Sequence, residues 1–86
     1  MNALHRLARV RATHVETDAA GRPLRIDGRD VETIRERWIV EEGWWTDEPV
    51  RRAYVEAVLT TGALEIVFHD LRRGGWHRHS GGRSGR

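Results

Sequence analysis

The chain has 86 residues, of which 38% are hydrophobic and 33% charged, with a formal net charge of +2 and no cysteine. A chain of this length and composition forms one globular domain and is not disordered. The lack of cysteine excludes disulfides, thiolate zinc sites and cysteine nucleophiles. No apolar run is long enough to span a bilayer, and the start of the sequence lacks the apolar core of a secretory signal, so we expect a cytoplasmic protein.

Three segments are expected along the chain. Residues 1–8 form a frayed N-terminus, and residues 9–79 form a single β domain. Residues 80–86 contain only serine, glycine and arginine. Because such a segment has nothing to bury, it predicts a flexible basic tail.

The first strands are expected before residue 31. Apolar and polar residues alternate over residues 9–15, which predicts a strand, and the segment Asp18–Pro23 predicts a turn. The pair Asp27-Gly28 is typical of a type I′ hairpin turn. That turn would set Leu24 opposite Val31 and Ile26 opposite Arg29.

Two interpretations are open for residues 30–40. As a helix, the segment would have Asp30 as its N-cap. As a strand, it would place Ile34, Trp38 and Val40 on one face together with Glu36. We expect a strand, because the run Trp-Ile-Val favours β structure and the neighbouring elements are strands.

The segment from Arg52 to Asp70 predicts a hairpin with a two-residue turn at Thr61-Gly62. In that register one face of the hairpin is uniformly apolar, as expected for a sheet that packs on a core. Its residues are Val55, Ala57, Leu59, Leu64, Ile66 and Phe68. The expected fold class is mainly β: a small antiparallel sheet or partly closed β-barrel of five to six strands.

Three of the four tryptophans occur within eight residues, at Trp38, Trp44 and Trp45. Trp38 is expected to fill the core. Adjacent residues of an extended chain point to opposite faces, so at least one of Trp44 and Trp45 should face outward. An exposed tryptophan beside arginines is typical of an interface hot spot or of a surface on which a nucleic-acid base stacks.

The candidate binding residues are Trp44, Trp45, Arg51, Arg52, Tyr54 and Trp76. Arg51 and Arg52 could form surface ion pairs with Asp47 and Glu48, or could contact phosphate or an acidic partner.

Candidate catalytic residues are scarce. His77 and His79 are separated by one residue, as in a His-x-His zinc motif, but His69 and Asp70 do not complete a known zinc-ligand spacing. Both serines lie in the tail, and no glycine-rich loop precedes a helix. We therefore expect no enzymatic activity, no catalytic residues, no metal and no cofactor.

The tryptophan and arginine pattern resembles two groups of proteins. It comprises Trp38, Trp44, Trp45, Arg51, Arg52 and Tyr54, followed by Val67-Phe68-His69-Asp70-Leu71 and Gly75-Trp76. The pattern resembles a family of small uncharacterised proteins from actinobacteria and deinococci. It is also similar to the C-terminal module of the catalytically inactive Y-family polymerase-like subunit of the bacterial mutasome. The polymerase-like body, the sliding-clamp motif and the DNA-contacting fingers of that subunit have no counterpart here.

This resemblance implies a non-enzymatic interaction module, an adaptor or regulator in DNA-damage tolerance and translesion synthesis. Its expected partner is a polymerase-associated protein, with no contact to a membrane. The alternative is a small β-barrel that binds single-stranded nucleic acid, as the interleaved aromatic residues and arginines also predict.

Overall fold

The computed structural model describes residues 10–79 and shows a mainly β domain, which confirms the expected fold class. Within this range there are seven strands and no helix. The strands are β1 (Val10–Ala12), β2 (Val15–Thr17), β3 (Pro23–Ile26), β4 (Arg29–Glu42), β5 (Val50–Leu59), β6 (Leu64–Asp70) and β7 (Trp76–His79). The segments predicted to be a frayed N-terminus (1–8) and a basic tail (80–86) lie outside the described residues.

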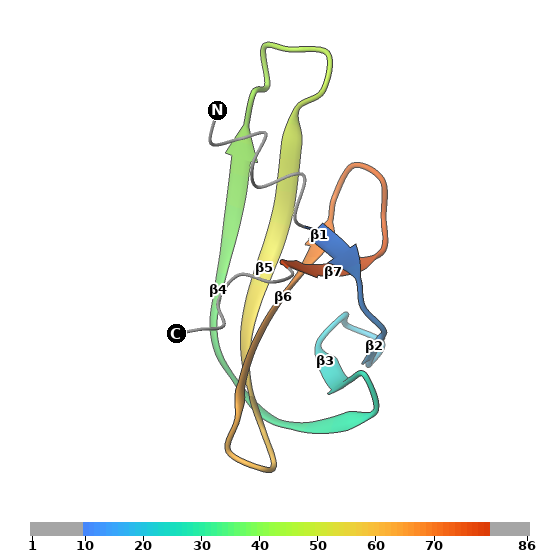
Figure 1. Ribbon diagram of the computed structural model, residues 1–86, viewed down its shortest axis with the longest axis vertical. Coiled ribbons are helices and arrows are strands. Elements are labelled where there is room, and N and C mark those ends of the chain that lie inside the picture. Colours follow the sequence, from blue (N-terminus) through green and yellow to red (C-terminus); the bar gives the residue numbers. More distant parts are fainter. Residues whose placement is uncertain (1–9, 80–86) are drawn as a thin grey trace.

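All strand pairs are antiparallel, and the order across the sheet is β1-β7-β6-β5-β4-β3-β2. The two outermost strands, β1 and β2, are consecutive in the chain and are separated only by Thr13 and His14. This short connection brings the two edges together, so the sheet curls into a half-barrel (Figure 1). The structure has seven strands in this range, whereas five or six were predicted. One additional strand arises because the expected first strand is interrupted at Thr13-His14.

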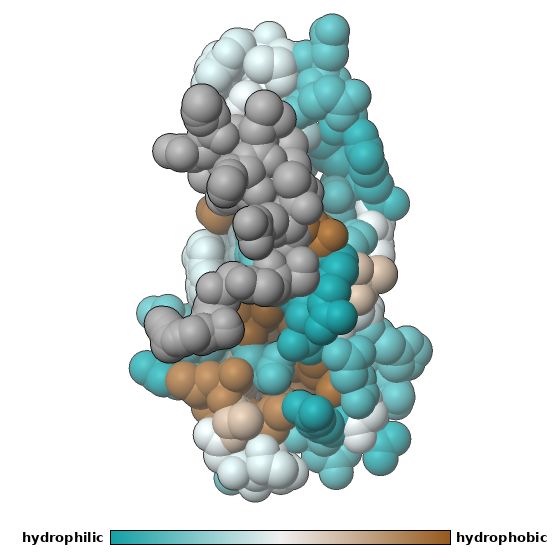
Figure 2. All heavy atoms as spheres, in the orientation of Figure 1, coloured by the Kyte–Doolittle hydropathy of each residue, from teal (hydrophilic) through white to brown (hydrophobic). Residues whose placement is uncertain are grey.

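The core lies inside the curl and is built from one face of the sheet. Its buried members are Ile26, Val55, Ala57, Leu59 and Val67, with Val15, Val31, Ile34 and Trp76 packed against them. They are mainly β-branched and aliphatic residues, which favour a pleated, half-buried surface. In Figure 2 the hydrophobic residues gather over the lower, curled half of the molecule.

The β5–β6 hairpin exists, but its predicted register is wrong by one residue. Val55 lies opposite Val67 and Tyr54 opposite Phe68. A three-residue turn, residues 60–62, joins Leu59 to Ala63, because the N–H of Leu59 donates to the carbonyl of Ala63 and the N–H of Gly62 donates to that of Leu59. Gly62 adopts a φ of 94°. A two-residue type I′ turn would need a positive φ at Thr61 as well, which a β-branched residue disfavours.

This shift moves every β6 side chain to the opposite face. Val67 enters the core, whereas Ile66, predicted to be buried, is 45% exposed. Glu65 lies opposite Ala57 and so on the core side of the sheet. Phe68 remains buried, but on the outer face of the sheet beside Tyr54.

The Asp27-Gly28 turn and the strand at residues 30–40 agree with the sequence analysis. Asp27 and Gly28 have φ values of 50° and 81°, as a type I′ turn requires, and Ile26 pairs with Arg29. The predicted common face of β4 is wrong, however. A register shift between Ile34 and Glu36 reverses the alternation. Ile34 therefore packs on the core, whereas Trp38 lies on the other face, 37% exposed, and does not fill the core.

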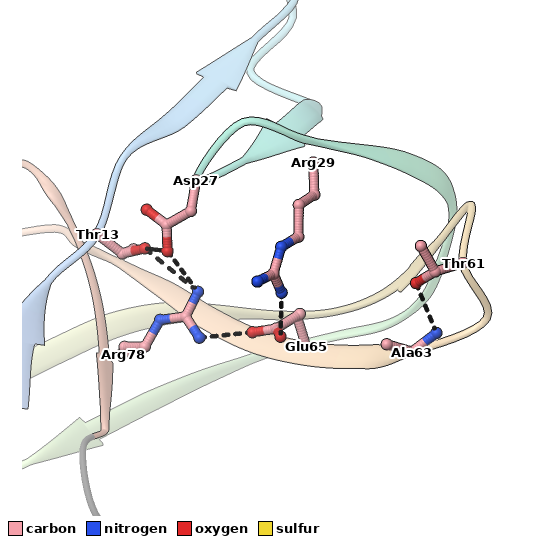
Figure 3. A network of polar contacts seen from close by, with 7 residues as sticks. All are labelled: Thr13, Asp27, Arg29, Thr61, Ala63, Glu65 and Arg78. Atoms are coloured by element: carbon pink, nitrogen blue, oxygen red, sulfur yellow. Dashed lines mark hydrogen bonds and ion pairs between the residues drawn. The ribbon is translucent and has the colours of Figure 1, made fainter.

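A cluster of polar side chains fastens the curl closed (Figure 3). Arg78 of β7 contacts Glu65 of β6 at 2.6 Å and Asp27 of the β3–β4 turn at 2.9 Å. Asp27 also accepts hydrogen bonds from the Thr13 hydroxyl and from the backbone N–H of His14. We call Thr13, Asp27, Glu65 and Arg78 the closure network, because they join opposite ends of the sheet.

The closure network predicts a loss of stability in acid. The hydrogen bond from the N–H of His14 lowers the pKa of Asp27 below its usual 3.8, although burial opposes it, and Thr13 and the charge of Arg78 lower it further. A carboxyl whose folded-state pKa is depressed stabilises the fold above its unfolded pKa, and this stability is lost as the pH falls through the folded-state value. We expect Asp27→Asn to be less stable than the wild type near neutral pH, and this difference to shrink as the pH falls through the lowered pKa of Asp27.

Urea denaturation at several pH values measures this difference. Asp47→Asn, which changes the net charge equally outside the network, should stay near the wild type at every pH. Asp18 and Asp70 also have lowered pKa values, so the Asp27→Asn protein keeps part of its acid sensitivity. A constant gap between Asp27→Asn and the wild type across the whole pH range would contradict the prediction.

Candidate functional site

The strands β4 and β5 extend beyond the rest of the sheet as a two-stranded arm (Figure 1). We define the arm as residues 40–52, since Arg52 forms the last pair between β5 and β6. Its turn is built by Gly43 and Thr46: the N–H and the hydroxyl of Thr46 both donate to the carbonyl of Gly43, at 2.8 and 2.7 Å. The φ of Gly43 is 63°, a value that glycine adopts without strain. The turn thus holds residues 44–49 at the tip.

Trp44 and Trp45 occupy the arm tip and are the most exposed large hydrophobic side chains in the described part of the chain. Their exposed fractions are 76% and 71%. The rings meet edge to face, with centroids 5.4 Å apart and planes at 87°. Both side chains therefore face solvent, whereas the sequence predicted this for at least one of them. A perpendicular pair offers a ridged apolar knob and no common flat surface.

The charges around the tip are mostly negative. Between Trp38 and Val50 the sequence has four carboxylates, Glu41, Glu42, Asp47 and Glu48, and no arginine. The arginines nearby come from other segments: Arg51 pairs with Glu41 across the strands, and Arg73 reaches Glu48, both at 2.8 Å. The predicted pairing of Arg51 with Asp47 or Glu48 is not formed. The tip itself is an apolar knob with an acidic border.

A row of stacked rings crosses the outer face of the sheet at the base of the arm. Trp38 stacks on Tyr54 with a centroid distance of 5.3 Å and an angle of 5°. Tyr54 in turn contacts Phe68 and His79. Its hydroxyl forms a 2.7 Å hydrogen bond with Nε2 of His79. These contacts bury Tyr54 to 8% exposure, so this candidate binding residue stabilises the base of the arm and presents little surface to a partner.

Arg52 is also buried, with only 5% of its surface exposed. Its guanidinium lies 4.3 Å from the centre of the Phe68 ring and donates to the Tyr54 hydroxyl at 3.2 Å. The sequence suggested a surface role for Arg52 as for Arg51. The alternation of β5 explains the difference, because Arg52 shares the face of Tyr54 whereas Arg51 points to the other face.

Trp76 packs against the core and stacks on His69 at 5.1 Å, so this candidate is likewise engaged within the fold. His77 stacks on Phe68, on the face opposite to His69. The alternation of β6 and β7 therefore separates His69 from His77 and His79, which both contact Phe68. Among residues 10–79 no group of three or more histidine and carboxylate side chains is arranged to hold a metal ion.

Of the six predicted binding residues, the structure leaves Trp44, Trp45 and Arg51 exposed. A second group escaped the sequence analysis: Arg72 and Arg73, in the β6–β7 turn, reach the arm through Pro49 and Glu48. Their adjacency at a turn was the available signal, but the approach of that turn to the arm is set by tertiary structure.

The chain matches no protein-family model, no curated protein and no solved structure. Within the described residues there is no helix that could cross a membrane.

Proposed function

We propose that the protein is a non-enzymatic interaction module that docks on another protein through the arm tip. The observation that carries this proposal is the exposure of Trp44 and Trp45 at the end of a protruding hairpin. Tryptophan is enriched at the centres of protein interfaces, where a few buried aromatic anchors supply most of the binding energy.

The charge of the tip supports a protein partner over nucleic acid. Nucleic-acid binding depends on cations that neutralise phosphates, and residues 39–49 contain four carboxylates and no arginine. The perpendicular tryptophan rings also differ from the flat stacking surfaces on which successive bases lie. The partner surface that fits the tip is an apolar pocket bordered by lysine or arginine.

The proposed partner class is a polymerase-associated protein of DNA-damage tolerance. It rests on the resemblance of the tryptophan and arginine pattern to the C-terminal module of the inactive mutasome subunit. Two residues of that pattern, Trp44 and Trp45, are the exposed anchors, while Trp38, Arg52 and Tyr54 support the base of the arm. The pattern would then encode both the anchors and the scaffold that presents them.

Replacing both tip tryptophans should abolish docking and leave the fold intact. Because the two side chains are exposed, Trp44→Ala/Trp45→Ala should change the unfolding free energy by less than about 1 kcal/mol. Loss of two interface anchors should weaken binding by at least about 100-fold, since each such residue contributes about 2 kcal/mol or more. Leu24→Ala, which removes an exposed apolar side chain away from the arm, is the matched control.

The measurement is affinity capture with the tagged full chain from cells treated with a DNA-damaging agent. Binding is then reconstituted with the purified partner. Capture of a replication or repair polymerase subunit by the wild type and by Leu24→Ala, but not by the tip variant, is expected. If the purified protein instead binds single-stranded DNA in a salt-dependent manner that needs Trp44 and Trp45, the nucleic-acid alternative replaces this proposal.

A further inference from the structure

A pocket of about 340 Å³ lies beside the arm, and Trp44 and Trp45 are not among its lining residues. Its walls come from the end of the β4–β5 turn, the start of β5, the end of β6, the β6–β7 turn, and single residues of β7 and β1. They are Val10, Glu48, Pro49, Val50, Arg51, Arg52, Asp70, Arg72, Arg73, Gly74 and His77. Four arginines and two acidic residues are among these lining residues, although the side chain of Arg51 points to the face opposite to Arg52 and pairs with Glu41.

The buried guanidinium of Arg52 is the unusual feature of this pocket. Charged groups are rarely buried unless an opposite charge contacts them. Within residues 10–79 no carboxylate oxygen lies within 4 Å of the Arg52 guanidinium; its one polar contact is the neutral Tyr54 hydroxyl. A guanidinium has five N–H donors, so most of its donor capacity is unused.

Asp70 is the nearest candidate counter-charge, but its carboxylate has other partners. Its Oδ1 accepts the backbone N–H groups of Arg72 and Arg73, both at 2.9 Å. Burial tends to raise the pKa of Asp70, yet these two hydrogen bonds and the charges of His77 and Arg52 lower it below its usual value. Asp70 is therefore ionised and organises the turn, while Arg52 still lacks a direct ionic contact.

The remaining arginines of the pocket keep free donors as well. Arg72 donates one N–H to the carbonyl of Pro49, and Arg73 donates one to Glu48. Arg51 uses its Nε for Glu41. The bonds to Pro49 and Glu48 hold the side chains of Arg72 and Arg73 beside the arm and leave further N–H groups on each. In addition, the buried Nδ1 of His77 has no hydrogen-bond partner among the described residues.

We propose that this pocket binds an oxyanion, with Arg52 as its central ligand, and that the oxyanion is the phosphate group of a small molecule. Arg52, Arg72 and Arg73 outnumber the two lining carboxylates, Glu48 and Asp70, and arginine binds phosphate through two parallel N–H bonds. The volume of about 340 Å³ lies at the small end of the range for ligand sites. Trp44 and Trp45 do not line the pocket, so phosphate binding and protein docking can be tested with separate variants.

The test is an NMR titration of the full chain with inorganic phosphate against chloride at equal ionic strength. Signals of the Arg52 side-chain Nε–H and of the Gly74 and His77 amides should shift and saturate in the millimolar range. Arg52→Gln should weaken phosphate binding at least 10-fold. Arg35→Gln, which removes an exposed arginine outside the pocket, should change it less than twofold.

Acetate serves as a second probe, because a carboxylate could occupy the same donors. Acetate binding that matches or exceeds phosphate binding would overturn the assignment to phosphate. Should Arg52→Gln fail to fold, Arg72→Ala/Arg73→Ala keeps the buried arginine and should still weaken phosphate binding at least fivefold. Shifts that do not saturate, or that spread equally to Arg35 and Arg37, would show ordinary surface screening and refute the site.

Discussion

Replacing Phe68 with alanine should lower the free energy of unfolding by about 3–5 kcal/mol, the usual cost of deleting a buried phenyl ring. Phe68 is 1% exposed and lies in the row of rings on the outer face of the sheet, between Tyr54 and His77. It also carries the buried guanidinium of Arg52 on its ring face. Its loss would leave a cavity and remove the apolar support of a buried charge, so the effect should be near the top of that range.

Two neighbours on β6 provide matched controls that also test the register. Val67 is fully buried, and Val67→Ala should cost about 2 kcal/mol, whereas Ile66 is 45% exposed and Ile66→Ala should cost less than about 1 kcal/mol. The register suggested by the sequence predicts the reverse order for these two substitutions. Urea denaturation followed by circular dichroism decides between them. A larger loss for Ile66→Ala than for Val67→Ala would disprove the pairing of Val55 with Val67.

Arg78→Met should be the most disruptive single change of a charged residue in the closure network. The side chains of Arg78 and Glu65 are each 18% exposed, and Arg78 also contacts Asp27. Without Arg78 the Glu65 carboxylate keeps, among the described residues, only its 4.0 Å contact with Arg29, and breaking a fully buried ion pair costs about 3–5 kcal/mol. Because some solvent reaches this pair, we expect about 2–3 kcal/mol.

Arg25→Met is the comparison for Arg78→Met. Arg25 pairs with Asp30 at the same 2.8–2.9 Å range, but both side chains are about half exposed, so its loss should cost less than about 1 kcal/mol. Adding Glu65→Gln to Arg78→Met should recover part of the lost stability, because it removes the negative charge that Glu65 would carry without Arg78. Equal losses for Arg25→Met and Arg78→Met in urea denaturation would show that the closure network is an ordinary set of surface contacts.

Local signals in the sequence predict much of this fold. The Asp27-Gly28 pair specifies its turn because both residues tolerate a positive φ, and the alternation of β5 assigns Val55, Ala57 and Leu59 to the core. The errors in the predicted strand faces arise where a turn or a register shift adds or removes one residue. The three-residue connection before Ala63 reverses β6, and the register shift after Ile34 reverses β4. Because side chains alternate between the two faces of a strand, a shift of one residue reverses the predicted face of every residue in it.

The candidate site likewise has residues that local sequence predicts and residues whose environment depends on tertiary contacts. The sequence singles out Trp44 and Trp45 because adjacent residues of an extended chain point to opposite faces, so at least one of them should face outward. The status of Arg52 and Tyr54 is decided by Phe68 and His79, which approach from other strands. The anion pocket depends on the contact between the β6–β7 turn and the arm, and no local pattern predicts a contact between segments more than 20 residues apart.

The curl of the sheet also affects the order in which its strands pair during folding. The pairing of β1 with β7 joins positions 65 to 69 residues apart, from Ala12 with His77 to Val10 with His79, whereas the β5–β6 hairpin closes over three residues. Loop-closure entropy grows with the logarithm of loop length, so the β1–β7 pairing costs about 2–3 kcal/mol more to close. We therefore expect the local hairpins to form before β1 pairs with β7. Since Val10 and His79 are neighbours in space, a short linker between them would turn the longest loop of the fold into one of the shortest.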